Sequence, residues 1–217
     1  MAAPTPIKID FVSDVVCPWC AIGLKSLEQA LQNLGSDVEV NLHFQPFELN
    51  PQMAPEGEDV AEHLARKYGS TPEQMTQNQE AIRQRGADVG FTFDMDKRKR
   101  IVNTFDAHRL LHWAALEGRQ TELKQALLAA YFTQGRDVSS HDVLVDVAAK
   151  VGLDPLTARL VLDEGRYAQD VRAQEQFYQS QGIRAVPSVI VNDRYLIQGG
   201  QPAEVFEQTL RRIAAEG

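Results

Sequence analysis

The chain lacks the features that mark several well-known classes of protein. Only two of its 217 residues are cysteine, which excludes a disulfide-rich secreted scaffold. No run of about 18 apolar residues occurs, and the N-terminal MAAPTPIKID has neither a basic segment nor an apolar stretch of the length found in signal peptides. We therefore expect a cytoplasmic protein that makes no contact with a membrane.

Positive charge is also scarce. The 22 Lys and Arg residues face 30 Asp and Glu residues, which gives a net charge of −8 and opposes binding to nucleic acid. The short basic run Lys97–Arg100 is interpreted as a solvated helix start rather than as a binding site for an anion. Repeats and low-complexity tracts are absent, and 43% of the residues are hydrophobic, so the chain can bury a substantial core.

The opening of the chain has the pattern strand, helix, strand. The residues IKIDFV from Ile7 alternate, which predicts a strand. Apolar residues then recur at steps of three and four from Pro18 to Leu34, which predicts a helix with proline in its tolerated first turn and Gly35 at its end. Alternation returns at Val38 and predicts a second strand that ends near Pro46.

The middle of the chain, from about residue 50 to 182, is expected to be entirely helical. Thr71 and Asp154 each precede a proline and have the character of helix N-caps, and Gln74 completes a capping box with Thr71. Glycines at the far ends of the periodic segments predict three helix stops, at Gly86, Gly152 and Gly182.

After Gly182 the period of two returns. The segment VPSVIVND predicts a strand, Asn192-Asp193-Arg194 a hairpin turn, YLIQ a second strand, and Pro202 the start of a final amphipathic helix. Together the pattern predicts an α/β thioredoxin fold (βαβ-ββα) with a large all-helical insertion. We place the thioredoxin-like domain at residues 1–58 and 178–217 and the inserted helical domain at residues 59–177.

The two cysteines, Cys17 and Cys20, are the most informative feature. Cys17 falls at the amino terminus of the predicted helix, where free N–H groups and the helix dipole favour a thiolate, so we expect it to be the attacking sulfur. Cys20 lies one turn further on, within reach to resolve a mixed disulfide. Pro18 and Trp19 between them are expected to tune the helix start and to contact the substrate.

Two other interpretations of the pair were weighed. Both cysteines could be small buried hydrophobes, or they could form half of a zinc site. A second cysteine pair is missing and only histidines could complete a zinc site, so a redox dithiol is preferred, with no metal. His108 and His112, four residues apart, could hold a metal, but local packing is favoured because no acidic third ligand has helical spacing.

Val186-Pro187 is the second candidate feature. A proline at the start of a strand cannot donate to the sheet ladder, and a cis bond there would turn the Val186 backbone outward to pair with an extended peptide. The sequence itself leaves open whether this bond is cis or trans.

Three segments, DFVSDVVCPWCAIGLKSLEQAL, NTFDAHRLLHWA and AVPSVIVNDRYLIQGGQP, resemble the DsbA family of thioredoxin-fold oxidoreductases, specifically its cytosolic FrnE-like branch. This resemblance implies that Cys17 is the nucleophile, Cys20 the resolving thiol and Pro187 a cis-proline that faces them. It also places Asn103 and His108 at the active-site cleft. The branch is similar to kappa-class glutathione transferases and 2-hydroxychromene-2-carboxylate isomerase, and by analogy with these Gln201 could hold the γ-glutamyl end of glutathione.

The expected function is that of a cytosolic thiol–disulfide oxidoreductase acting on protein or peptide disulfides and thiols. No cofactor is required, glutathione is an optional co-substrate, and a homodimer is consistent with the relatives that the chain resembles. The alternative is a glutathione-dependent isomerase or transferase acting on a small aromatic substrate, which would survive loss of Cys20. A third class, a non-catalytic binding or chaperone module, would tolerate replacement of both cysteines.

Overall fold

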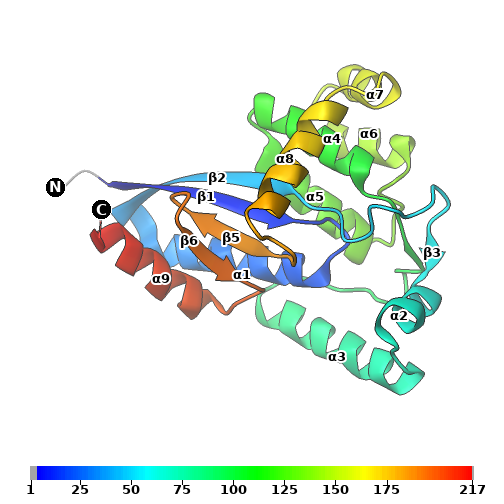
Figure 1. Ribbon diagram of the computed structural model, residues 1–217, viewed down its shortest axis with the longest axis horizontal. Coiled ribbons are helices and arrows are strands. Elements are labelled where there is room, and N and C mark those ends of the chain that lie inside the picture. The colour runs from blue at the N-terminus through cyan, green and yellow to red at the C-terminus, as the bar shows by residue number, and fades with distance from the viewer. Residues whose placement is uncertain (1–3, 217) are drawn as a thin grey trace.

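The computed structural model describes residues 4–216, and its central element is a four-stranded sheet (Figure 1). The strands are β1 (Thr5–Ser13), β2 (Val38–Pro46), β5 (Ser188–Val191) and β6 (Tyr195–Gln198), in the order β2-β1-β5-β6. Strand β1 runs parallel to β2 and antiparallel to β5, so that Phe11 is paired with both Phe44 and Val189. Strands from the two ends of the chain therefore share one sheet, and the predicted thioredoxin fold is confirmed.

Helices cover both faces of this sheet. Helices α1 (Pro18–Leu34) and α9 (Ala203–Glu216) pack on the face that carries Ile7, Ile9 and Phe11. Helix α8 (Ala168–Ser180) crosses the other face (Figure 1), where its Tyr178 packs against Val12. A one-turn 3₁₀ helix, η1 (Gly35–Asp37), connects α1 to β2.

Besides α8, six helices lie in the sequence between β2 and β5: α2 (Val60–Tyr68), α3 (Pro72–Asp88), α4 (Phe105–Leu116), α5 (Gln120–Phe132), α6 (His141–Lys150) and α7 (Pro155–Asp163). In Figure 1, α2 and α3 lie on the opposite side of the sheet's end from α4, α6 and α7. No helix within residues 4–216 combines the length and apolar character needed to span a membrane.

The insertion is not entirely helical, which corrects the prediction. A short antiparallel ribbon joins β3 (Glu58–Asp59) to β4 (Arg100–Ile101). The basic run at 97–100 accordingly leads into β4 and does not start a helix. The Arg100 guanidinium explains this, because it donates hydrogen bonds of 2.6 and 3.0 Å to the carbonyl groups of Glu56 and Gly57 and so holds the ribbon in place.

Most of the predicted element ends are confirmed. The capping box of Thr71 and Gln74 forms, and the Asp154 side chain caps α7. The expected turn at residues 192–194 joins Val191 to Tyr195, and its first two residues, Asn192 and Asp193, have positive φ. Gly86 is the exception, since α3 continues to Asp88. A Cβ at Gly86 would lie 2.4 Å from the Phe93 ring, so this glycine allows close packing rather than a helix stop.

The division into two domains stays a prediction. One cluster of buried side chains runs from Phe206 in α9, through Leu24 in α1, to Leu127 in α5, so the sheet layer and the inserted helices share a core. The expected boundary at 177/178 falls within α8.

Candidate functional site

Cys17 lies at the amino terminus of α1. It is the N-cap residue, with extended backbone angles, and Pro18 occupies the first helical turn. The backbone N–H of Cys20 donates a 3.1 Å hydrogen bond to the Cys17 carbonyl group. The Cys17 side chain is 4% exposed and Cys20 is completely buried, and both are free thiols. The helix start thus presents one sulfur near the surface and holds the second behind it.

The two thiols ionise differently. A hydrogen bond from the Cys20 thiol lowers the pKa of Cys17, and the backbone N–H groups of Cys20 and Trp19 lower it further, against the opposing effects of burial and of the Asp14 charge. Burial and the neighbouring Cys17 sulfur raise the pKa of Cys20 well above its ordinary value. Of the two thiols, Cys17 therefore ionises more readily than Cys20.

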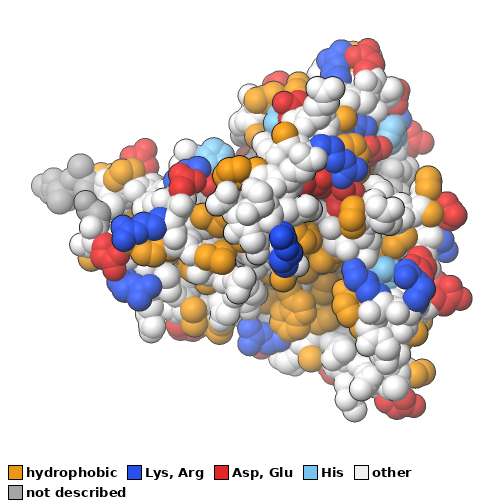
Figure 2. Space-filling view, viewed as in Figure 1, with side chains coloured by type: hydrophobic (Ala, Val, Ile, Leu, Met, Phe, Trp, Pro, Cys, Tyr) orange, Lys and Arg blue, Asp and Glu red, His pale blue; other side chains and the backbone are white. Residues whose placement is uncertain are grey.

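An open pocket of about 540 Å³, the dithiol cleft, lies over Cys17. Its floor and walls are mainly apolar, and Figure 2 shows this hydrophobic hollow beside the lower helices of Figure 1. Trp19 and Tyr68 at its sides are 41% and 61% exposed. The lining residues come from α1, α2, α3, β4 and from the loops before α1, after β2, after α2, before β4 and before β5: Val16, Cys17, Pro18, Trp19, Leu49, Asn50, His63, Leu64, Tyr68, Ser70, Met75, Asn78, Gln79, Ala81, Ile82, Arg98, Ile101 and Val186.

The loop before β5 faces the same sulfur. The Val186–Pro187 peptide bond is cis, and the Cys17 thiol donates to the Val186 carbonyl group across 3.8 Å. Gly23 of α1 allows this approach, because a Cβ there would lie 3.1 Å from the Pro187 ring. The fold thus brings together Cys17, Val186 and Pro187 from opposite ends of the chain.

Three other predicted site residues do not line the dithiol cleft. Asn103 donates to the Met53 carbonyl group and accepts from the Phe105 N–H, so its side chain organises the start of α4. Gln201 donates to the Gln198 carbonyl group at the end of the hairpin. His108 is buried and lies beside Asp14, in the loop that precedes Cys17.

His108 contacts the buried carboxylate of Asp14, a residue that the sequence did not mark as part of the site. Asp14 accepts hydrogen bonds of 2.8 Å from the Val15 and Leu49 N–H groups, and His108 Nε2 lies 3.2 Å from Asp14 Oδ1 and 3.1 Å from the Phe47 carbonyl oxygen. Burial alone would raise the pKa of Asp14, but the hydrogen bond and charge of His108 lower it. A carboxylate in a predicted turn carries no sequence signal of burial.

Lys124 of α5 is a second buried charge near the dithiol, and it is 1% exposed. Burial lowers the pKa of its ammonium group, while attraction to Cys20, Asp14 and Cys17 opposes that shift. Its positive charge in turn lowers the pKa of Cys20. It lies on the apolar stripe of α5, beside Leu123 and Leu127, and that helical period is the signal in the sequence that could have placed it on the buried face.

A third buried group joins the sheet layer to α8. Glu48, which follows β2, and Glu175 both pair with Arg172, whose guanidinium lies 3.7 Å from the Phe105 ring centre. Burial raises the pKa of Glu48 to about 7 despite the contact with Arg172.

Within residues 4–216, no three His, Cys, Asp or Glu side chains are arranged as a metal-binding cluster. His112, the partner considered for His108, instead stacks on Tyr167 with ring centres 5.0 Å apart.

Comparison with known proteins agrees with this site. A family model described as "DSBA-like thioredoxin domain" matches residues 8–211. The chain belongs to this family. The predicted membership of the DsbA family is thereby confirmed, and it accounts for the dithiol at a helix start with a proline loop opposite.

Individual proteins extend the comparison. A probable DsbA oxidoreductase from Streptomyces coelicolor is 33% identical, with a TM-score of 0.91 over 97% of this chain and 91% of that chain. An uncharacterized Bacillus subtilis protein, YwbO, is 28% identical over 94% of this chain and 96% of its own length. The cytosolic disulfide reductase DsbM from Pseudomonas aeruginosa, solved with GSH, shares the fold at 17% identity, with a TM-score of 0.64 over 94% of this chain and 98% of that chain.

Proposed function

We propose that the protein is a thiol–disulfide oxidoreductase acting on protein or peptide disulfides, with Cys17 as nucleophile and Cys20 as resolving thiol. The observation that carries this proposal is the asymmetry of the pair. Cys17 has a lowered pKa and lies at the floor of an open apolar cleft, whereas Cys20 is buried behind it with a raised pKa.

The reaction follows from this arrangement. The Cys17 thiolate attacks one sulfur of a substrate disulfide, the substrate S–S bond breaks, and the departing thiolate takes up a proton. Cys20 then loses its proton and attacks the Cys17 sulfur, which releases the second substrate thiol and leaves a Cys17–Cys20 disulfide. Two electrons have passed from the protein to the substrate, and an external thiol must supply two to restore the dithiol.

The substrate is held by the residues around Cys17. An extended peptide can pair with the exposed backbone of Val186, next to Pro187, while its apolar side chains contact Trp19 and the walls of the cleft. Pro18 fixes the start of α1 and borders the same cleft. Asn103, His108 and Gln201 lie outside the cleft, so we assign them no direct contact with a peptide.

Glutathione is the external thiol that we propose, in keeping with the DsbM structure that contains GSH. A cytoplasmic setting would favour reduction or isomerisation of substrates over net oxidation, because the glutathione pool there keeps exposed dithiols reduced. The cytoplasmic location and a homodimeric state stay predictions.

The experiment is a trapping assay with a disulfide-bonded fluorogenic peptide. Cys20→Ser should accumulate a mixed disulfide with Cys17, since attack occurs but resolution does not, and Cys17→Ser should lose turnover by at least about 100-fold. Assays with dithiothreitol in place of glutathione test whether glutathione itself is needed as the external thiol. Undiminished turnover by Cys17→Ser would overturn the proposal. Glutathione-dependent turnover of an aromatic substrate that survives Cys20→Ser would instead support the isomerase or transferase class.

A further inference from the structure

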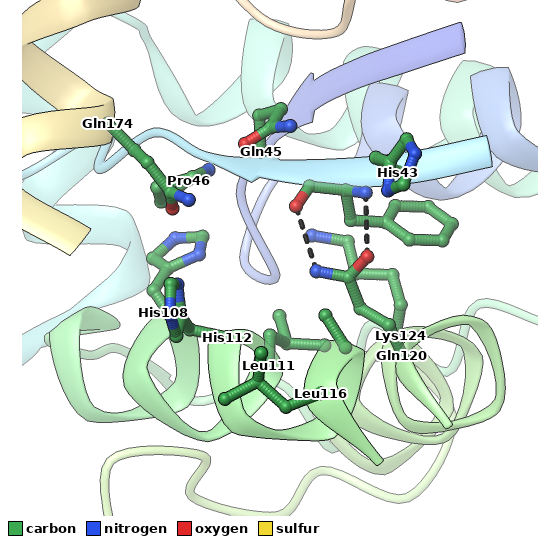
Figure 3. A pocket seen from close by; sticks show the side chains of 12 residues that line it. His43, Gln45, Pro46, His108, Leu111, His112, Leu116, Gln120, Lys124 and Gln174 are labelled. Carbon is green, nitrogen blue, oxygen red and sulfur yellow. Dashed lines mark hydrogen bonds between the residues drawn. The ribbon is translucent and has the colours of Figure 1, made fainter. Parts of the chain in front are cut away.

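A second pocket, here called the lysine pocket, lies between β2 and α4 and has about 210 Å³ of space. Helices α5 and α8 complete its walls (Figure 3), and it shares no lining residue with the dithiol cleft. The space equals roughly seven water molecules at about 30 Å³ each. It is therefore too small for a peptide and large enough for a molecule of a few heavy atoms.

Lys124 forms the buried end of this pocket. Figure 3 shows its side chain reaching along the cavity, with the amino nitrogen directed toward the side where His108 and His112 lie. Within residues 4–216 this nitrogen makes no hydrogen bond or ion pair, although the residue is 1% exposed, and the Phe44 ring centre is 5.9 Å away. It is not among the buried side-chain atoms that are cut off without a partner, so it faces the space of the pocket. Its donors need acceptors, which water or a ligand in the pocket can supply.

The polar neighbours of Lys124 do not meet this need. The Gln120 amide is directed at Phe44, because its side chain accepts from the Phe44 N–H and donates to the Phe44 carbonyl group, each at 2.9 Å (Figure 3). The oxygens of Asp14 are used by backbone N–H groups and by His108. His112 and Gln174, which also line the pocket, form no hydrogen bond within residues 4–216 and add further free polar groups.

The mouth of the pocket is apolar. Leu116 there is 66% exposed, Ala115 beside it is also exposed, and Leu111 continues the same wall inward. A ligand that satisfies both ends therefore has a compact anionic group at Lys124 and a short hydrocarbon portion toward the mouth.

We propose that the lysine pocket is a second binding site that takes a small carboxylate with a short apolar tail. The carboxylate accepts hydrogen bonds from Lys124 and Gln174, and the tail contacts Leu111 and Leu116. The proposal does not depend on the dithiol being catalytic. If the dithiol is catalytic, a bound carboxylate offsets the Lys124 charge that stabilises the Cys20 thiolate, and so slows resolution of the mixed disulfide.

Butyrate is a suitable probe, with binding followed by calorimetry and by the His112 side-chain NMR signals. Wild-type protein should bind butyrate, and Lys124→Met, which keeps the length of the side chain, should weaken binding at least tenfold. The matched control Lys150→Met removes an exposed lysine that pairs with Asp146 on α6, and should bind as wild type does. Leu116→Asp places a negative charge at the exposed mouth and should also weaken binding, which provides a test if Lys124→Met fails to fold.

Three results would overturn the proposal: no binding of butyrate, equal binding by wild type and Lys124→Met, or equal binding of butylammonium. Inorganic phosphate binding as tightly as butyrate would overturn the assignment of an apolar tail. The double variant Cys17→Ser/Cys20→Ser should still bind butyrate, so failure of the redox function and failure of this site give different outcomes.

Discussion

The sheet layer and the inserted helices contribute different parts of the dithiol's surroundings. The sheet layer supplies both sulfurs through α1 and the Val186 carbonyl group through the loop before β5. The insertion supplies the buried polar side chains of His108 and Lys124 behind them, together with the α2 and α3 wall of the cleft. The reactive atoms are thus local to one motif, whereas their ionisation depends on contacts such as His108 to Asp14, which are 94 residues apart in sequence.

The largest effect that would test this division is expected from His108→Leu. The change leaves the Asp14 carboxylate buried without the imidazole nitrogen 3.2 Å from it, and removes the same nitrogen from beside the Phe47 carbonyl group. Loss of one member of a buried pair costs about 3 kcal/mol, which we expect as the fall in the free energy of unfolding in urea. The matched control is His112→Leu on the same helix, which loses only its stacking on Tyr167 and should cost less than about 1 kcal/mol. Equal costs for the two variants would show that the insertion does not stabilise the Cys17 loop through His108.

Substitutions at Gly86 in the insertion and at Gly23 in the sheet layer compare the same two regions, with smaller expected effects on stability. Gly86→Ala in α3 places a Cβ 2.4 Å from the Phe93 ring and 2.7 Å from the Phe91 carbonyl oxygen, and should cost about 1–3 kcal/mol of stability. The rate at which iodoacetamide alkylates Cys17 should not change.

Gly23→Ala in α1 should behave in the opposite way. Its Cβ would lie 3.1 Å from Pro187 and 3.2 Å from the Gly200 backbone, so the proline loop must shift, while the higher helix propensity of alanine offsets about 1 kcal/mol of the cost. Turnover should fall several-fold with little change in the urea midpoint. If Gly23→Ala turns over at the wild-type rate, the reaction does not depend on the position of the loop that contains Pro187.

The sequence predicts the sheet layer well and the insertion less well, for physical reasons. Period-two patterns and turn residues such as Asn192-Asp193 are local, so the strands, the hairpin and the start of α1 could be located directly. The ribbon of β3 and β4 has two residues in each strand, too few to show a period, and depends on Arg100 reaching carbonyl groups 43 and 44 residues away. Asp14 carries no local sign of burial, because only the packed fold removes it from water. Lys124 differs, because it lies on the apolar stripe of α5, but the helical period does not tell which charged groups it meets there.

The smallest effect concerns Glu48, where the sheet layer meets α8. Burial raises the pKa of Glu48 to about 7, and a carboxyl group with a raised folded-state pKa contributes stability that is present below the unfolded-state value and is lost as pH rises through the folded-state value. The melting temperature should therefore fall between about pH 5 and pH 8, by roughly 2–4 °C for each kcal/mol lost. Glu48→Gln, which cannot ionise, should flatten that slope.

Asp154 provides the matched control for this pH dependence. Hydrogen bonds from the hydroxyl and the backbone N–H of Thr157 lower the pKa of Asp154, so it stays ionised over the whole range and its contribution does not change there. Asp154→Asn should therefore keep the wild-type slope, although its melting curve is displaced as a whole. If Glu48→Gln and wild type lose stability with pH in parallel, Glu48 does not titrate in this range, and the junction between the sheet layer and α8 is insensitive to pH near neutrality.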